Sequence, residues 1–226
     1  MIGFRVCERH RQISEKWFAQ FKLLSVANIS DVMARITAGG PTIRPYYSGE
    51  SMVGAALTVK TRPGDNLMVH KALDMAGPGD VIVVDAGGDL TNAIIGELMV
   101  AHATQRGLAG IVIAGAIRDS EVLRSGRFPV FAAGITHRGP YKDGPGEINV
   151  SISINGMVVA PGDLVCGDAD GIVTVGIDDV QTVYEMALVK QAKEVALMDA
   201  IKAGTSDRTW VDAELNRLGC TVPHIF

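Results

Sequence analysis

Aromatic residues are scarce in this sequence: Phe, Trp and Tyr together make up 5% of its 226 residues. The hydrophobic core must therefore be built from aliphatic side chains, and the hydrophobic fraction of 47% is large enough to supply them. This composition excludes an intrinsically disordered chain. The length suits one α/β domain with a sizeable core.

Cysteine is also sparse. Cys7, Cys166 and Cys220 are odd in number and far apart in the sequence. They form neither the paired framework of a disulfide-stapled secreted domain nor the close spacing of a zinc site. We interpret them as reduced, structural thiols.

Long apolar runs and blocks of basic residues are both missing. No apolar run approaches the roughly 18–20 residues that span a bilayer, and the charged N-terminus has no signal-peptide core. The formal net charge is −4, the pI is near 5.7, and Lys and Arg are scattered. Since nucleic-acid binding needs clustered positive charge, we expect a cytoplasmic protein with neither a nucleic-acid nor a membrane partner.

Strand and helix patterns alternate through the middle of the chain. Runs rich in β-branched residues predict strands over 51–61, 81–88, 110–117 and 129–133. Helical patterns lie over 67–76, 93–106 and 120–125. This order predicts an α/β fold with a parallel βαβ core. Tight Gly, Asp and Pro turns in 148–175 predict an additional, antiparallel β layer.

Helical patterns also flank this core. Residues 14–36 are predicted to be helical, with a Ser/Asp cap at 28–31 that starts a second short helix. Residues 178–203 predict one long C-terminal helix. Because neither an internal repeat nor a linker separates the segments, we expect residues 1–226 to form a single domain.

Arg118 and Asp119 follow directly on the apolar run 110–117. Ligands of open parallel sheets bind just beyond the carboxyl ends of the strands, which is where these two residues are expected. Arg has a planar fork suited to a carboxylate, and Asp is a hard oxygen ligand for Mg²⁺. The competing interpretation is structural: Asp119 caps the helix that starts at Ser120, and Arg118 pairs with a surface acid.

Two neighbouring loops add candidates on the same side of the predicted sheet. Gly96-Glu97-Leu98-Met99 lies near a helix start, where free backbone N–H groups attract an anion. Glu97 is equally explained as a solvated acid in a first helical turn. Asp65 and Asn66 are interpreted first as caps of the helix that follows, and His70 as a packed or solvated residue. Asn66 and His70 are also kept as indirect contributors to a site.

The motifs PGDN followed by His, GELM, GIVIAGAIRDSEVL, FPVFAAG and PGDLVCGDADGIVTV occur in one order and spacing. Together they resemble the family of class II 4-hydroxy-4-methyl-2-oxoglutarate / 4-carboxy-4-hydroxy-2-oxoadipate aldolases, which also contains the RraA regulators of ribonuclease E. The similarity covers roughly residues 20–203. It implies a swivelling β/β/α domain, assembled as a homotrimer or a dimer of trimers with active sites between subunits.

The resemblance implies roles for individual residues. Arg118 would bind the pyruvyl group, and Asp119 would anchor Mg²⁺, Mn²⁺ or another divalent cation through a water shell. Backbone amides of Gly96–Met99 would contact the pyruvate carboxylate and enolate. Glu97, and Glu194 from a neighbouring subunit, would order the waters around the metal.

The implied activity is cleavage of a 2-keto acid to pyruvate and a second 2-keto acid, with oxaloacetate decarboxylation by the same chemistry. Breaking the bond leaves a pyruvate enolate. A divalent cation and Arg118 would stabilise the negative charge of this enolate. A water polarised by Glu97 and Glu194 would remove the C4 hydroxyl proton. The alternative is a non-catalytic, RraA-type inhibitor of ribonuclease E. A methyltransferase is disfavoured because VDAGGD only weakly matches a cofactor-binding loop.

Two segments depart from the family pattern. After the GDADG turn the chain reads Ile-Val-Thr-Val-Gly, which we interpret as a structural change in the β layer. The loop 136–156 is rich in Gly and charge, and it is expected to reshape the end of the substrate site.

Overall fold

The structure is a computed structural model that describes residues 2–221, and it divides into two compact units, Met1–Ala187 and Leu188–Phe226. Its mixed sheet with helices and a long C-terminal helix confirms the predicted α/β class. The strands are β1 Phe4–Val6, β2 Arg44–Pro45, β3 Met52–Thr61, β4 Asp80–Asp85, β5 Ala93–Ile95, β6 Gly110–Ile117, β7 Val130–Ile135, β8 Gly146–Ile148, β9 Ile152–Ile154, β10 Met157–Val159, β11 Leu164–Asp168 and β12 Gly171–Val175. The helices are α1 Lys16–Phe21, α2 Val26–Val32, α3 Leu67–Met75, α4 Glu97–Gln105, α5 Ser120–Ser125, α6 Val180–Lys202 and α7 Thr209–Arg217.

The central sheet of the first unit is parallel in its middle, and antiparallel pairs join β8, β11, β12 and β2 to it, while the edge strand β1 pairs in parallel with β8. Strands β3, β4, β6 and β7 pair in parallel, as the alternating strand–helix order predicts. Strands β8 and β11 add to β3 in antiparallel fashion, and β12 pairs with β11. The hairpin β9–β10 forms its own two-stranded sheet. The predicted antiparallel layer is thereby confirmed.

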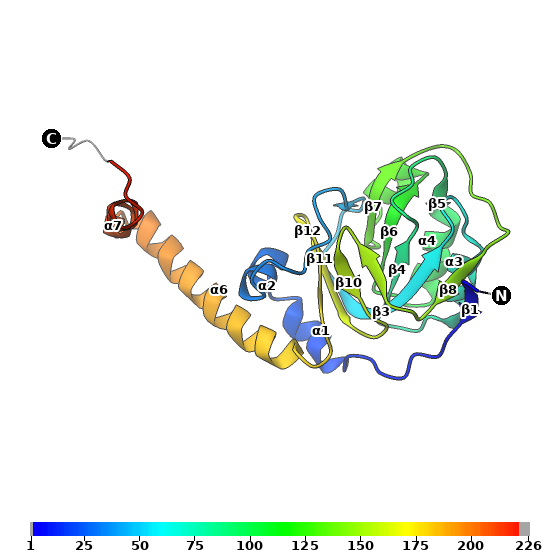
Figure 1. Ribbon diagram of the computed structural model, residues 1–226, viewed down its shortest axis with the longest axis horizontal. Helices are drawn as coiled ribbons and strands as arrows, with labels where there is room; N and C mark the ends of the chain where they lie inside the picture. Colours follow the sequence, from blue (N-terminus) through cyan, green and yellow to red (C-terminus); the bar gives the residue numbers. More distant parts are fainter. Residues whose placement is uncertain (1, 222–226) are drawn as a thin grey trace. The chain divides into compact units, whose positions relative to one another are not determined.

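Both faces of the sheet are buried. Successive side chains of β3 alternate between faces, so Leu57 packs with α3, α4 and α5 while Ala56 packs with the β9–β10 hairpin. Figure 1 shows the hairpin in front of the sheet, with α3 and α4 beyond it. A third cluster joins α1, α2 and the first turns of α6 to β11 and β12 through Phe21 and Ile29. Helices thus pack on one face of the sheet, through α3, α4 and α5, and against β11 and β12, through α1, α2 and α6.

Two predicted boundaries are wrong. Residues 93–95 belong to a strand, since Ala93 and Ile95 pair in parallel with the end of β6 and are buried there, and the helix begins only at Glu97. The cap predicted at 28–31 lies inside α2. Ser25 is the actual cap, because its hydroxyl accepts the Asn28 N–H at 3.2 Å.

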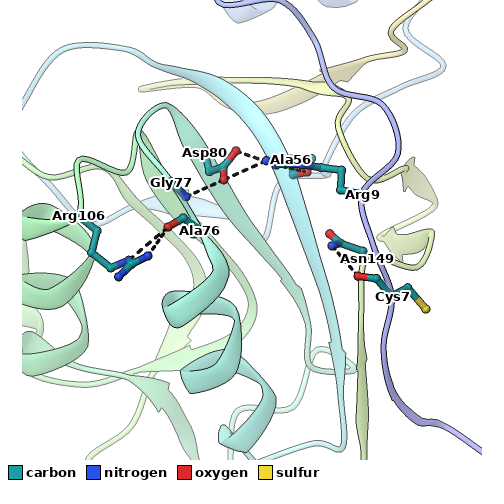
Figure 2. Close-up of polar contacts among 8 residues, drawn as sticks. All are labelled: Cys7, Arg9, Ala56, Ala76, Gly77, Asp80, Arg106 and Asn149. Carbon is teal, nitrogen blue, oxygen red and sulfur yellow. Dashed lines mark hydrogen bonds and ion pairs between the residues drawn. The ribbon is translucent and has the colours of Figure 1, made fainter.

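The N-terminal segment is bound along the sheet. Strand β1 pairs with β8, and the Asn149 side chain donates to the Cys7 carbonyl at 3.0 Å. Arg9 then forms a two-pronged ion pair with Asp80, at 2.7 and 3.2 Å. Asp80 is 3% exposed and also accepts the Gly77 N–H, as Figure 2 shows. These contacts fix the start of β4 as well as the segment itself.

The second unit holds the rest of α6, from Leu188, and α7. Its helices carry large exposed apolar side chains, including Leu197, Met198 and Trp210. None of the helices within residues 2–221 combines the length and the apolar character needed to cross a bilayer.

Candidate functional site

The end of β6 is built around an unusual backbone turn. Asp119 adopts the left-handed conformation, with φ 55° and ψ 36°, which is uncommon for a residue other than glycine. Its side chain does not cap α5, the helix that follows, so the predicted capping role is wrong. Instead its Oδ2 accepts the backbone N–H of Glu97 at 3.0 Å, at the start of α4. Asp119 therefore caps the helix of the neighbouring βα unit.

Arg118 is held beside this carboxylate. Its backbone N–H donates to the Ile95 carbonyl at 3.0 Å, which ties the end of β6 to β5. Its Nε lies 3.7 Å from Asp119 Oδ2, and the two side chains are 44% and 39% exposed. Both charged groups are accessible to a ligand, and they sit at the carboxyl end of a buried parallel strand, as predicted.

Glycine is required where these side chains meet. A Cβ on Gly96 would lie 2.3 Å from Asp119 Oδ2 and 3.0 Å from Arg118 Cγ. A Cβ on Gly139 would lie 3.3 Å from Arg118 Nη1. The bare backbone at Gly96 thus makes room for both site side chains, and the loop through Gly139 passes beside the guanidinium.

The start of α4 offers free hydrogen-bond donors. Gly96 occupies the cap position and has no side chain to satisfy the first turn. Asp119 takes the Glu97 N–H. Within residues 2–221, the backbone N–H groups of Leu98 and Met99 donate to no protein acceptor. An anion held by Arg118 is therefore next to unsatisfied donors at a positive helix end.

A hollow of about 190 Å³ lies over these residues. It brings together most of the residues that the sequence singled out, along with wall residues from β5 and from the loop after β7. Its lining consists of Asn66, His70, Ile94, Ile95, Gly96, Leu98, Met99, Arg118, Asp119, Pro140 and Lys142.

Asn66 supports the wall of the hollow. Its Nδ2 donates to the Ile94 carbonyl at 2.9 Å and faces Met99 Sδ at 3.4 Å, which joins α3, β5 and α4. Its Oδ1 is buried and accepts no hydrogen bond from the described residues. Of the two predicted caps of α3, Asp65 is confirmed, since its Oδ1 accepts the Leu67 N–H at 2.9 Å, whereas the Asn66 side chain forms no capping hydrogen bond.

His70 also lines the hollow, one turn into α3. Burial lowers the pKa of its imidazole below the usual value, and the positive charge of Lys142 and the neighbouring His102 lower it further, against an opposing effect of Asp74. The imidazole is consequently neutral near pH 7, when it can donate from one ring nitrogen and accept at the other.

Asp65 anchors the loop that contributes Pro140 and Lys142 to the lining, a role that its sequence context did not reveal. It is 0% exposed, and its Oδ2 accepts the backbone N–H groups of Asp143 and Gly144 at 2.7 and 2.9 Å. Arg62 pairs with the same oxygen at 3.1 Å. Asp65 thus both caps α3 and anchors the 141–144 loop. The second role depends on Asp143 and Gly144, which lie 78 and 79 residues further along the chain.

The two predicted glutamates lie elsewhere. Glu97 is exposed at the first position of α4, where its backbone N–H donates to Asp119. Among the described residues, Glu97 does not belong to the lining of the hollow. Glu194 belongs to the second unit, on α6, where its carboxylate pairs with Lys190 at 3.0 Å. Their roles remain predictions.

The described residues contain no group of three or more His, Cys, Asp or Glu side chains placed to hold a metal ion. The donor set at the hollow is instead one carboxylate beside one guanidinium. Asp119 Oδ2 is occupied by Glu97, whereas its Oδ1 has no hydrogen-bond partner in residues 2–221.

A mixed sheet with a hollow at the carboxyl ends of its parallel strands, lined by an Arg–Asp pair, is an α/β arrangement whose chemistry suits a small anionic molecule. Residues 26–174 match the RraA-like family, described as Aldolase/RraA. The chain belongs to this family.

Individual relatives cover most of the chain. A protein of Halalkalibacterium halodurans named "Putative 4-hydroxy-4-methyl-2-oxoglutarate aldolase" is 42% identical over 82% of this chain and 88% of its own length. Among solved structures, an uncharacterized protein from Pseudomonas syringae pv. tomato has a TM-score of 0.77 at 26% identity, over 87% of this chain and 97% of that one. The RNA-processing inhibitor RraA from Thermus thermophilis has a TM-score of 0.62 at 30% identity, over 67% of this chain and 92% of that one. The fold prediction is confirmed by these neighbours.

Proposed function

We propose that this protein is a divalent-metal-dependent lyase that cleaves 4-hydroxy-4-methyl-2-oxoglutarate or 4-carboxy-4-hydroxy-2-oxoadipate to pyruvate and a second 2-keto acid, and that also decarboxylates oxaloacetate. The observation that carries the proposal is the convergence of Arg118, Asp119 and the free N–H groups of α4 on one hollow. The name of the Halalkalibacterium halodurans relative supports the same activity.

The donor set fits a hydrated hard cation. Mg²⁺ keeps several of its waters and is commonly bound through one or two carboxylates, so it does not need a cage of protein ligands. Asp119 Oδ1 meets that requirement, because Oδ2 is already taken by Glu97. Asp119 would therefore hold Mg²⁺, Mn²⁺ or another divalent cation. When bound, the cation supplies positive charge to the oxygens of a 2-keto acid.

Residues of the chain itself bind the substrate and stabilise the charge that develops on it. Arg118 pairs with the 2-keto acid carboxylate and keto oxygen, and the N–H groups of Leu98 and Met99 point at the same anion. Loss of the C4 hydroxyl proton breaks the C3–C4 bond and sends its electrons to the C2 oxygen, so that one product leaves as a carbonyl compound and the other forms as pyruvate enolate. A proton added at C3 then gives pyruvate.

The base for the C4 hydroxyl is a water polarised by Glu97 and by Glu194 of a second copy. Glu97 is exposed beside Asp119, and Glu194 is half-exposed on α6. We propose a homotrimer or a dimer of trimers that brings the second copy's Glu194 to the hollow. The oligomeric state from light scattering and the activity of Glu194→Gln test this part separately.

Pyruvate release tests the proposal. Lactate dehydrogenase and NADH report pyruvate from each substrate, first with Mg²⁺ and then with excess EDTA. We expect turnover with Mg²⁺ and its loss with EDTA. Turnover that is unaffected by EDTA contradicts the metal, and the absence of turnover with all three substrates contradicts the lyase.

A regulator of RNA processing is the second candidate, and the RraA structure from Thermus thermophilis favours it. Inhibition of purified ribonuclease E by this protein, together with the absence of lyase activity, is the result that selects this alternative.

A further inference from the structure

A second hollow, of about 300 Å³, lies in the first unit, and the charged residues in its lining are Lys22, Glu50 and Arg127. We propose that this second hollow is a binding site for a small amino acid with an acidic side chain. The inference does not rest on the proposed lyase function, because it concerns a different end of the sheet and different residues.

The second hollow lies at the amino ends of the parallel strands. Val53 is near the start of β3, Ala109 comes directly before β6, and Pro129 comes directly before β7. Arg118, in contrast, follows the last residue of β6. Because a strand rises about 3.3 Å per residue, the length of β6 separates the two hollows by roughly 25–30 Å. The two linings share no residue, so a ligand in one does not occupy the other.

The charged side chains of the second hollow are not paired with each other. Lys22 and Arg127 are exposed cations, and Glu50 is an exposed acid. Among the residues that the structure describes, none of these three forms an ion pair. Two cations and one carboxylate complement a ligand that carries two carboxylates and one ammonium group. This is the charge pattern of glutamate and aspartate near pH 7.

The surface between the charged groups is largely apolar. Val53, Leu108, Ala109 and Pro129 belong to the same lining. An apolar wall with a few charged groups around it is the usual composition of a site for a small molecule, and the volume is near the lower end of such sites. The second hollow therefore suits a ligand of amino-acid size, with its methylene groups on the apolar wall.

The segments that carry the charged residues are tied to one another. The Ser51 hydroxyl donates to the Lys22 carbonyl at 3.4 Å, which joins the start of β3 to the end of α1. A Cβ on Gly49 would lie 2.8 Å from the Arg127 carbonyl oxygen, so glycine is what allows this loop to approach the segment before β7. Glu50 lies between Gly49 and Ser51, and its backbone is thus held between the two cations.

Titration calorimetry of the full-length protein tests the site with two amino acids and two analogues. Glutarate lacks the ammonium group of L-glutamate, and L-norvaline has a methyl group in place of the side-chain carboxylate. We expect L-glutamate or L-aspartate to bind at millimolar concentrations, and both analogues to bind more weakly than L-glutamate. Absence of binding by both amino acids, or equal affinity for L-glutamate and glutarate, overturns the proposal.

Variants locate the ligand and assign the acid. Glu50→Gln and Arg127→Gln should each weaken L-glutamate binding on the order of 10-fold, because each removes a charge-assisted hydrogen bond. Glu50→Gln should not weaken glutarate, which has no ammonium group for this acid to bind. An equal loss for both ligands in Glu50→Gln contradicts its assigned role. The control Glu8→Gln, an exposed acid outside the lining, should change neither affinity.

Arg118→Gln separates this site from the first hollow. It should leave L-glutamate binding unchanged, since Arg118 lines only the other hollow. Binding that is lost in Arg118→Gln but retained in Arg127→Gln places the ligand at the Arg118–Asp119 pair and overturns the second site. The absence of pyruvate release from all lyase substrates contradicts the proposed function alone and leaves this inference standing.

Discussion

Gly96 is the position where the smallest substitution should have the largest effect on the site. In Gly96→Ala the new Cβ would lie 2.3 Å from Asp119 Oδ2. Because a carbon and an oxygen do not approach much closer than about 3.2 Å without bonding, the carboxylate must move by about 1 Å. The Glu97 N–H to Oδ2 distance, now 3.0 Å, would then exceed hydrogen-bonding range.

The cost of this movement differs between folding and catalysis. The atom that must move is the end of a side chain that is 39% exposed, so the lost hydrogen bond lowers the free energy of unfolding by only about 1 kcal/mol. A displacement of about 1 Å in a catalytic group can lower the rate on the order of 100-fold. We therefore expect a folded protein with little lyase activity.

The assay pairs thermal unfolding with pyruvate release. Gly77→Ala is the matched control, since a Cβ there has no neighbour within 4 Å and the site is remote from the hollow. Gly96→Ala should unfold within a few degrees of Gly77→Ala and lose most of its activity. Wild-type activity in Gly96→Ala would refute the assignment of Asp119 to the active site.

Two further predictions concern the fold. Arg9→Met leaves the buried Asp80 without its partner and should lower the free energy of unfolding in urea by about 3 kcal/mol. Arg5→Met removes a pair in which the arginine is 64% exposed, and it should change this free energy by less than about 1 kcal/mol; equal effects would contradict the assigned burial. Burial raises the pKa of the Cys166 thiol, so Ellman's reagent should modify the exposed Cys220 in the native protein and Cys166 only after unfolding, and rapid native labelling of Cys166 would contradict this.

Patterns that depend on neighbouring residues in the chain were readable from the sequence. The apolar run 110–117 gave β6 its bounds and placed Arg118 and Asp119 at a strand end, because a strand buried on both faces must be continuously apolar. The segment 93–95 was misassigned to a helix. Its partner, the end of β6, is what makes Ala93–Ile95 a strand, and pairing with a distant segment leaves little trace in three residues.

Contacts across the chain account for what was missed at the site. The carboxylate of Asp119 was expected to cap the helix that follows it, which is the usual local interaction. It caps α4 instead, because its left-handed backbone turns it toward Gly96, which has no side chain to block the approach. Asp65 accepts the Asp143 N–H from the loop after β7, and Lys142 of that loop lines the hollow, so neither residue could be assigned to the site from its own surroundings.

Exchange of the methyl protons of pyruvate for deuterium measures enolate formation without any cleavage step. In D₂O with Mg²⁺, the wild-type protein should remove the methyl signal from the proton NMR spectrum, and both EDTA and Asp119→Asn, which keeps an acceptor for the Glu97 N–H but loses the charge, should prevent this. Exchange that continues in Asp119→Asn at the wild-type rate would contradict the central claim, that Arg118 and a cation on Asp119 stabilise a pyruvate enolate in this hollow.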